Sequence, residues 1–278
     1  MTTVPTGRGP GKGVRDVAVR PVLAGDPYFM ESLARGLSVI RAFSGGRTHL
    51  SGAEVAAVTG LSRAAARRCL HTLTVLGYAT AVSGGYELTP AVLTLGQAYL
   101  DSASLARAAQ PVLEHVVAQL EESAAVAVLD GHEVVFVARA AARRILSVEL
   151  SIGSRLPAAS TGSGRVIVAC GEEQVRERFL RRVKLSRWTR YSIVEKKDLR
   201  AELARVREQG YAIVDQELEV GLRSIAVPIR DRNGGIHAAL NVGVQAARID
   251  TRTLQRDVLP VLRAAAAEIG RGLSGAVR

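Results

Sequence analysis

The sequence is poor in aromatic residues and in sulfur. Phe, Trp and Tyr make up only 4% of its 278 residues, and it contains two cysteines and two methionines. Its cores must therefore be built from Ala, Val, Leu and Ile. Apolar residues still total 47%, so most of the chain is expected to fold, and its length favours two domains.

Motifs that would indicate catalysis or metal binding are also missing. Cys69 and Cys170 lie 101 positions apart, outside any Cys-x-x-Cys or Cys/His cluster, so both are predicted to be buried, reduced thiols. Five histidines are scattered, and no HExxH, GxSxG, Walker or GxGxxG pattern occurs. Sequence distance does not exclude a cluster in space, but these absences argue against an enzyme, and we expect no metal ion or cofactor.

No apolar run approaches the roughly 18–20 residues needed to span a bilayer. The first twenty residues are rich in Gly, Pro, Arg and Thr and lack the apolar core of a signal peptide. We therefore expect a cytoplasmic protein with no membrane partner and with a flexible basic tail over residues 1–26.

Acidic residues are too few to balance the basic ones. The 37 Lys and Arg exceed the 26 Asp and Glu, which gives a formal net charge of +11. Such a surplus favours polyanionic partners, nucleic acid before anionic membrane, although an Arg-rich composition alone would also produce it. Residues 176–197 carry nine basic and two acidic residues. They form either a solvated face or a second anion-facing surface.

The stretch SGAEVAAVTGLSRAAARRCL, residues 51–70, has the pattern of a helix-turn-helix. Ser51 and Glu54 form a capping box that starts one helix. Gly60 suits the positive-φ position of a tight turn, and Ser62 can cap a second helix. The corner between the two helices is predicted to be filled by small and apolar residues: Val55, Ala56, Leu61, Ala66, Cys69, Leu70 and Leu73.

The opposite face of the second helix is basic, and it ends next to a predicted hairpin, YATAV (78–82) and YEL (86–88), which resembles the wing of a winged helix. Arginines near a helix N-terminus suit guanine edges or phosphates, and the small wing tip suits backbone N–H contact to phosphate. A solvated basic face is the alternative. The predicted DNA-binding residues are Ser51, Ser62, Arg63, Ala64, Arg67, Arg68, His71 and Gly84.

The rest of the chain predicts a linker helix and an α+β domain. Thr89-Pro90 opens a helix to about Ala108, and Pro111 opens another. Turns at Asp130-Gly131 and Asn233-Gly234 join strand pairs, and RILSVEL (144–150) is a further predicted strand. Three more helices are predicted over 172–185, 197–209 and 254–270. The predicted domains are a winged helix-turn-helix over 27–89, a linker helix over 90–108 and an effector domain over 109–278.

Four segments resemble the isocitrate lyase regulator (IclR) family of bacterial transcription factors: SLARGLSVIRAF, LSRAAARRCLHTLTVLGY, RLPAASTGSGRV and GYAIVDQELEVGLRSIAVPI. The resemblance covers about residues 28–272. It implies an N-terminal winged helix-turn-helix, a linker helix and a C-terminal α+β effector domain of the GAF/PAS-like kind. It also implies homodimers, often homotetramers, whose binding to operator DNA is altered by a small organic acid.

Within the family, segments such as AVLDGHEVVFVAR and VDQELEVGLRSIAVPIRD most resemble regulators of aromatic catabolism through protocatechuate and β-ketoadipate. The effector implied is an acid of this type. The alternatives are an IclR-type regulator of an unrelated catabolic operon and, less favoured, an enzyme fused to a DNA-binding module.

The loop from Ser160 to Gly164 precedes a predicted helix and is the first candidate wall of an effector site. Glycines let backbone N–H groups approach a ligand, a helix N-terminus favours an anion, and the hydroxyls of Ser160, Thr161 and Ser163 add donors. A tight loop that merely needs a flexible backbone is the alternative. The resemblance assigns ligand contact to Gly162, Ser163, Asp215, Leu222, Ser224, Asn241 and Gly243.

Two arginines are candidate counter-ions for a dicarboxylate, because a guanidinium binds a carboxylate in two-point fashion. These are Arg139 and Arg155, and a surface salt bridge is the alternative for each. Asp215 suits a carboxylate ligand poorly. It could orient Arg223, receive a ligand hydroxyl or cap a turn.

Overall fold

The computed structural model describes residues 26–102, 104–142 and 150–273. The tail expected over 1–26 and the strand expected over 144–150 thus lie almost wholly outside the described residues. The chain divides into two compact units, with the boundary between Tyr99 and Leu100.

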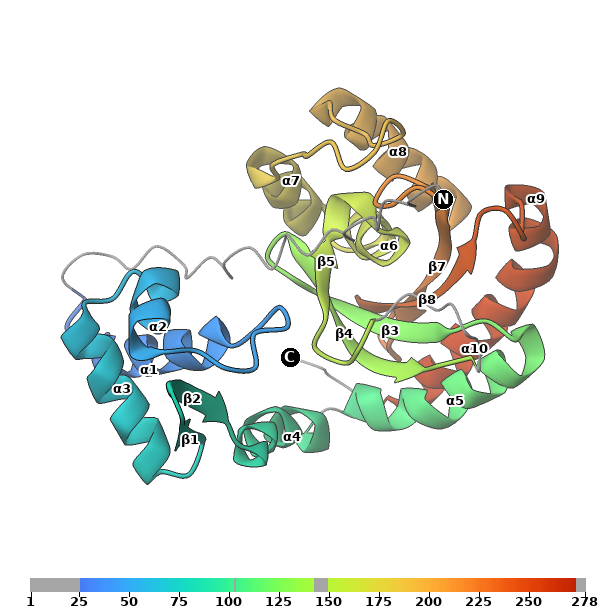
Figure 1. The fold of residues 1–278 in the computed structure, drawn as a ribbon. Coiled ribbons are helices and arrows are strands. Elements are labelled where there is room, and N and C mark those ends of the chain that lie inside the picture. The colour runs from blue at the N-terminus through green and yellow to red at the C-terminus, as the bar shows by residue number, and fades with distance from the viewer. Residues whose placement is uncertain (1–25, 103, 143–149, 274–278) are drawn as a thin grey trace, which may run out of the picture. The chain divides into compact units, whose positions relative to one another are not determined.

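The N-terminal unit is a three-helix domain with a two-stranded sheet (Figure 1). A small core is formed by apolar side chains from every element, among them Val39, Val55 and Leu70, each with no exposed surface. The elements are α1 (Glu31–Ala42), α2 (Gly52–Thr59), α3 (Arg63–Val75), β1 (Ala79–Val82) and β2 (Gly85–Leu88).

A short helical connection follows the sheet. The Thr89 hydroxyl accepts a hydrogen bond from the Ala91 N–H, as an N-cap does. The 3-10 turn η1 (Pro90–Val92) leads into α4 (Leu93–Ser102), and α5 covers Ser104–Leu120.

The helix start predicted at Pro111 is wrong, because Pro111 lies inside α5. A proline removes one backbone hydrogen bond from a helix and usually ends it. Here the residues on both sides of Pro111 are held by burial, which outweighs that local preference. The buried side chains are Leu105, Ala109, Val112, Leu113 and Val116.

The C-terminal unit is built on a six-stranded antiparallel sheet with the order β5-β4-β3-β8-β7-β6. Both predicted hairpins are present, with Gly131 (φ 64°) and Gly234 (φ 81°) at their turns. The strands are β3 (Ala124–Asp130), β4 (Glu133–Ala140), β5 (Arg155–Pro157), β6 (Ala212–Asp215), β7 (Leu222–Arg230) and β8 (Ile236–Gln245).

Helices cover both faces of this sheet (Figure 1), so the unit has two cores. We call the side with α5 and α10 (Leu259–Gly272) the α5 face, and the side with α6 (Gly162–Cys170), α7 (Glu173–Arg182) and α8 (Lys196–Gln209) the α6 face. The 3-10 turn η2 (Ala158–Ser160) precedes α6, and α9 (Thr251–Thr253) with the π-helical η3 (Leu254–Val258) precedes α10.

Strand alternation assigns each side chain to one face. Ile225, Val227 and Ile229 of β7 enter the core of the α5 face, whereas Ala226 enters that of the α6 face. On β8, Leu240 and Ala239 divide in the same way. The sheet therefore presents small residues to α6. The architecture is the expected α+β fold.

Candidate functional sites

The α2–α3 corner forms as the sequence predicts. The Ser51 N–H donates to Glu54 Oε2 at 2.8 Å and the Glu54 N–H donates to the Ser51 hydroxyl at 3.3 Å, which completes the capping box. Hydrogen bonds from the Ser51 N–H and the Ser51 hydroxyl to its carboxylate hold the pKa of Glu54 below its usual value. Gly60 adopts φ 71°, and the Ser62 hydroxyl accepts from the Ala65 N–H at 3.2 Å. The hydroxyls of both predicted contact serines thus already serve as caps.

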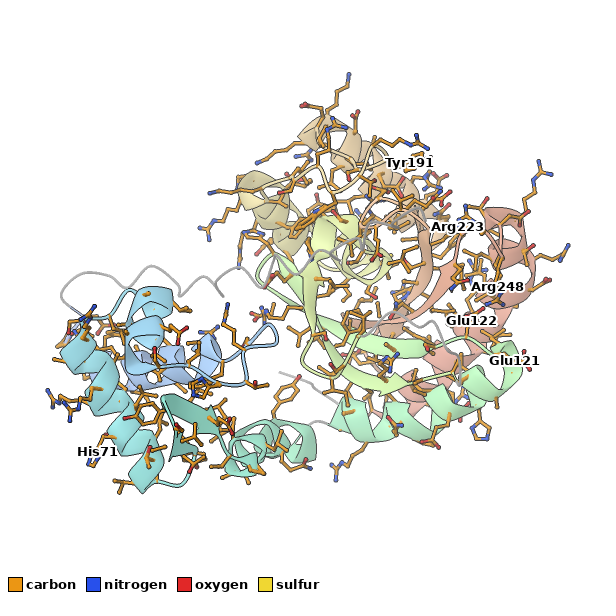
Figure 2. The ribbon with its side chains drawn as sticks, viewed as in Figure 1. His71, Glu121, Glu122, Tyr191, Arg223 and Arg248 are labelled. Atoms are coloured by element: carbon orange, nitrogen blue, oxygen red, sulfur yellow. The ribbon has the colours of Figure 1, made fainter. Side chains whose placement is uncertain are left out.

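The outward face of α3 is the one expected. Ala66, Leu70 and Leu73 are buried as the spacing predicts, whereas Leu61 and Cys69 are only half-buried. Figure 2 shows His71 projecting from the outer side of α3. The exposed residues of this face are Arg63, Ala64, Arg67, Arg68 and His71.

The wing is a tight hairpin supported by a third segment. Val82 pairs with Gly85, which leaves Ser83 and Gly84 (φ 82°) as the turn. Leu50 bridges to Tyr86 through backbone bonds of 3.1 and 2.9 Å.

Gly85 is required by this close approach. A Cβ at Gly85 would lie 2.6 Å from the Leu50 carbonyl oxygen and 2.8 Å from the His49 ring. The His49 Nε2 lies 3.3 Å from the Ser83 carbonyl oxygen. No local pattern predicts this support, because His49 and Ser83 are 34 positions apart.

In the C-terminal unit, the loop before α6 lies directly on the sheet. The Thr161 hydroxyl caps α6 by accepting from the Gly164 N–H at 3.2 Å. A Cβ at Gly162 would lie 3.2 Å from that of Ala226, and one at Gly164 would lie 2.2 Å from the Ala158 carbonyl oxygen. Both glycines are therefore set by close packing.

The strand register brings several predicted effector residues to the α6 face. Ala226 lies opposite Asn241, and Ser224 lies opposite Gly243. The nearest atom to a Cβ at Gly243 would be Leu222 Cδ1, at 3.9 Å. Because directly opposed residues share a face, Leu222, Ser224, Asn241 and Gly243 lie on the α6 face with Ala226. Gly162 packs against Ala226, and the buried Ser160 and Ser163 lie within two positions of Gly162 in the chain.

Arg139 joins this group because of a β-bulge. Phe136 lies opposite Ala127 and Arg139 lies opposite Ala125, with a register shift between them. The extra residue turns Arg139 to the same face as Phe136 although they are three positions apart. Ala125 also opposes Asn241, so Arg139 lies in one row with it across the sheet.

Two polar atoms of this group are buried without a hydrogen-bond partner among the described residues. They are Ser163 Oγ and Asn241 Oδ1, and Ser163 is only 1% exposed. An unsatisfied buried polar atom costs about 1–3 kcal/mol, so such atoms call for an explanation. A polar ligand beside the N-terminus of α6 would satisfy both.

Asp215 and Arg155 lie elsewhere. Asp215 opposes Arg223, which opposes Val244 of the α5 face, and the Asp215 carboxylate binds Arg223 through two bonds of 2.9 Å. Asp215 therefore orients Arg223, which was one of the three roles considered for it.

Arg155 opposes Val135 and binds two carboxylates, those of Glu133 (2.8 Å) and Asp130 (2.6 Å). Arg155 therefore forms salt bridges, the alternative to its predicted role as a counter-ion for the ligand.

Sequence reasoning missed a buried ion pair beside this site. The Arg165 side chain is 1% exposed and binds both oxygens of Glu217, at 2.7 and 2.6 Å. Arg165 Nε also donates to the Ala159 carbonyl at 2.8 Å. Glu217 in turn holds the segment before α8, since its carbonyl accepts from Ser192 Oγ at 2.7 Å. The partners are 52 residues apart, so spacing could not reveal them.

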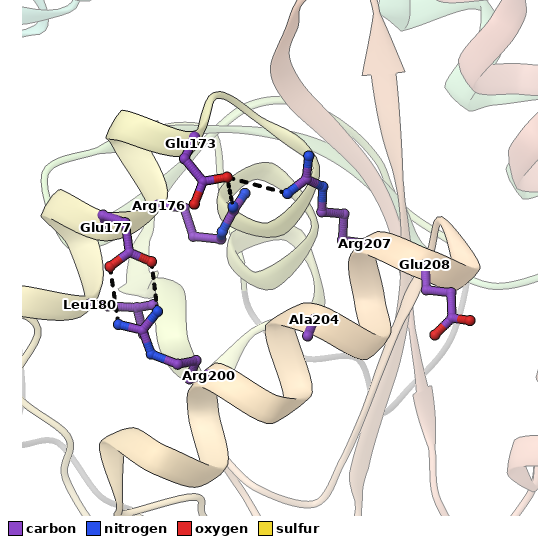
Figure 3. A pocket seen from close by; sticks show the side chains of 8 residues that line it. All are labelled: Glu173, Arg176, Glu177, Leu180, Arg200, Ala204, Arg207 and Glu208. Atoms are coloured by element: carbon purple, nitrogen blue, oxygen red, sulfur yellow. Dashed lines mark hydrogen bonds and ion pairs between the residues drawn. The ribbon is translucent and has the colours of Figure 1, made fainter.

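A cavity of about 530 Å³ lies between α7 and α8 and is lined in part by the basic region, through Arg176, Glu177 and Leu180 (Figure 3). Its arginines are already paired. Arg200 binds Glu177 at 2.6 Å, and Glu173 binds both Arg176 and Arg207. At this cavity the solvated-face interpretation is therefore favoured over an anion site.

Comparisons with known families agree with this arrangement. The model of the IclR helix-turn-helix domain matches residues 32–83, and that of the bacterial transcriptional regulator IclR C-terminal domain matches residues 97–271. The chain belongs to the IclR family. As an IclR-type transcriptional regulator, it combines a DNA-binding unit with an effector-binding unit.

Relatives share nearly the whole chain. The "Pca regulon regulatory protein" of Pseudomonas putida is 46% identical over 90% of this chain and 87% of its own. The "p-hydroxybenzoate hydroxylase transcriptional activator" of Acinetobacter baylyi is 37% identical over 87% and 91%.

Solved IclR structures have the same fold. A transcriptional regulator from Rhodococcus sp. RHA1 has a TM-score of 0.80 at 42% identity, covering 88% of this chain and 98% of its own. An IclR homolog from Microbacterium hydrocarbonoxydans, complexed with 4-hydroxybenzoate, has a TM-score of 0.75 at 27% identity, covering 87% and 98%. In the described part of this chain, no helix is long and apolar enough to cross a membrane.

Proposed function

We propose that this protein regulates aromatic-acid catabolism, and that protocatechuate, β-ketoadipate or a similar acid binds on the α6 face and changes its affinity for operator DNA. The observation that carries the proposal is the pair of unsatisfied buried atoms, Ser163 Oγ and Asn241 Oδ1, beside the N-terminus of α6. The names of its relatives support an aromatic-pathway acid as the effector, because they refer to the Pca regulon and to p-hydroxybenzoate hydroxylase.

The chemistry of the group suits an oxygen-rich acid. The first N–H groups of α6 lack helical acceptors and favour a carboxylate. Ser163 and Asn241 supply hydrogen bonds for hydroxyl or keto oxygens, and Arg139 supplies a positive charge on the same face. Asp215 and Arg155, which are engaged on the other face, have no part in this proposal.

The N-terminal unit would read the operator. The exposed α3 residues Arg63, Arg67 and His71 contact bases, with Arg68 nearer the phosphates and Gly84 of the wing on the backbone. Exposed large apolar side chains on α1 and α4 support dimerisation, which would place two copies of α3 in successive major grooves. These side chains include Leu33 (59% exposed), Leu37 (47%), Leu93 (74%) and Tyr99 (51%).

Calorimetric titration of the full-length protein tests the acid site. Protocatechuate, 4-hydroxybenzoate and β-ketoadipate are compared with gluconate, which represents sugar acids. We expect one of the first three to bind, and Ser163→Ala to weaken it by about 5- to 15-fold, the loss of about one hydrogen bond. Ser163→Phe should abolish binding.

The control is Ser186→Phe, at an exposed position outside the α6 face group. It should bind as the wild type does. Binding of gluconate alone would indicate regulation of an unrelated operon. Unchanged acid affinity in folded Ser163→Phe would overturn the proposed site.

A further inference from the structure

A series of ion pairs begins beside the proposed effector site and continues along the β6 edge of the sheet. Arg165 lies two positions after Ser163 on α6 and binds Glu217. Glu217 in turn follows β6 by two positions, since β6 ends at Asp215. A movement of α6 would therefore be passed to the end of β6 through a buried bond between opposite charges.

Asp215 connects β6 to the loop after β8. Its carboxylate binds Arg223, whose side chain is 10% exposed. Arg223 Nη1 donates to the carbonyls of Ala246, at 3.1 Å, and Ile249. A single guanidinium thus fixes the position of residues 246–249 relative to β6.

The same loop is bound to the end of α5. Arg248 Nη1 lies 2.9 Å from Glu122 Oε1, and Glu122 is only 5% exposed. Glu122 follows α5 by two positions, after Glu121, which adopts a positive φ of 53°. In Figure 2, Arg223, Arg248 and Glu122 follow one another along this edge of the unit.

We propose that these six residues form an ionic relay that couples the effector site to α5, with Arg223 as its positioning residue. The relay comprises Arg165, Glu217, Asp215, Arg223, Arg248 and Glu122. This inference rests on the proposed function, because it assigns the route by which a bound acid would act on the DNA-binding unit.

Electrostatics explains why these contacts would move together. Breaking the buried pair of Arg165 and Glu217 would leave an uncompensated buried charge, so these two side chains are strongly held to each other. An acid that shifts α6 moves Arg165, and the paired residues follow to keep their partners. At the far end α5 is held by Glu122, and in the chain α5 is separated from α4 by a single residue.

Two variants test the relay in the full-length protein. Arg223→Lys keeps the charge but loses the forked bonds, and Arg248→Gln breaks the link to Glu122 at a partly exposed side chain. The control is Arg252→Gln, an exposed arginine of α9 outside the relay. DNA selected by the wild type from a random duplex library serves as operator, and the acid found by calorimetry serves as effector.

The expected result is a loss of coupling rather than of binding. Both relay variants should keep acid and operator affinities within threefold of the wild type, while the operator affinity no longer changes when acid is added. Arg252→Gln should respond as the wild type does. A full acid response in either folded relay variant would overturn the inference.

Hydrogen exchange without any acid separates this inference from the proposed function. If the relay holds the end of α5, amides 118–123 should exchange about tenfold faster in Arg223→Lys than in the wild type, as expected for about 1.4 kcal/mol. Unchanged exchange there would overturn the relay even if an acid binds. Faster exchange would support it even if calorimetry finds no acid and the proposed function fails.

Discussion

At the scale of single residues, the exposed arginines of α3 carry the proposed base contacts. Arg63 and Arg67 are one turn apart on a helix whose opposite side is buried, so both point away from the core of the N-terminal unit. Their positions depend on caps that the structure confirms, at Ser51 and Ser62.

Arg67→Ala should weaken operator binding by about 5- to 150-fold, the effect of removing a specific base contact of 1–3 kcal/mol. Affinity for the acid should hardly change, because the side chain lies in the other unit. Fluorescence anisotropy at fixed salt measures the first quantity and calorimetry the second. Arg252→Ala removes the same charge from the effector unit and serves as control, and equal operator affinity for the two variants would contradict the assignment.

Glu122 predicts a pH dependence of stability. Burial raises the pKa of its carboxyl above the usual 4.5, an effect that the nearby Arg248 opposes and Glu121 reinforces. The folded state thus binds the proton more tightly than the unfolded state, so the contribution of Glu122 to stability falls as pH rises above about 4.5. The melting temperature of Glu122→Gln relative to that of the wild type should therefore be higher at pH 7 than at pH 4.5. A difference that is constant with pH would contradict this.

At the scale of elements, glycines decide how closely α6 approaches its neighbours. Gly164 has no room for a Cβ beside the Ala158 carbonyl, whereas Gly36 in α1 has no atom within 4 Å of one. The two positions therefore form a matched pair for the same substitution in helices.

Gly164→Ala should lower the free energy of unfolding by about 1–3 kcal/mol, as overpacking does. Gly36→Ala should raise it by about 0.5–1 kcal/mol through helix propensity. Urea denaturation followed by circular dichroism measures both changes. Equal effects of the two substitutions would show that the close approach at α6 is not a constraint.

The elements themselves were largely predictable, because their signals are local. The capping box at Ser51, the turn at Gly60 and the hairpin turn at Gly131 all depend on residues within a few positions of one another. Pro111 shows the limit of such signals, since burial on both sides keeps it inside α5.

The faces of the sheet were less predictable. Arg139 reaches the α6 face only through a bulge, and Asp215 misses it by one position of strand alternation. Arg155 belongs to a three-residue strand with no clear pattern. The buried pair of Arg165 and Glu217 joins segments 52 positions apart. Each of these outcomes depends on how strands pair or on contacts between distant segments, and the spacing of residues along the chain does not predict either.

At the scale of the whole molecule, an alanine-rich sequence with few aromatics still builds three cores within residues 26–102, 104–142 and 150–273. Small residues bring α6 against the sheet in one unit and let α2 and α3 cross in the other. The basic excess is denser in residues 1–90, which carry ten basic and five acidic residues, than in the remainder. This distribution agrees with DNA binding by the N-terminal unit.

The salt dependence of operator binding belongs to this scale. If the arginines of α3 bind the DNA, removing one arginine–phosphate interaction should reduce the slope of log affinity against log salt by about 0.9. Arg68→Ala, which removes a proposed interaction with the DNA backbone, should lower the slope by about this amount per protomer without changing which sequences are preferred. An unchanged slope would place Arg68 outside the interface.

The central claim is that an aromatic-pathway acid bound in the effector unit alters operator binding. Fluorescence anisotropy titration of the selected operator, at fixed salt, with and without saturating protocatechuate, 4-hydroxybenzoate or β-ketoadipate tests it most directly. At least one acid should change the operator dissociation constant by about fivefold or more, the lower end of ordinary allosteric coupling. Dissociation constants within twofold for all three acids would contradict it.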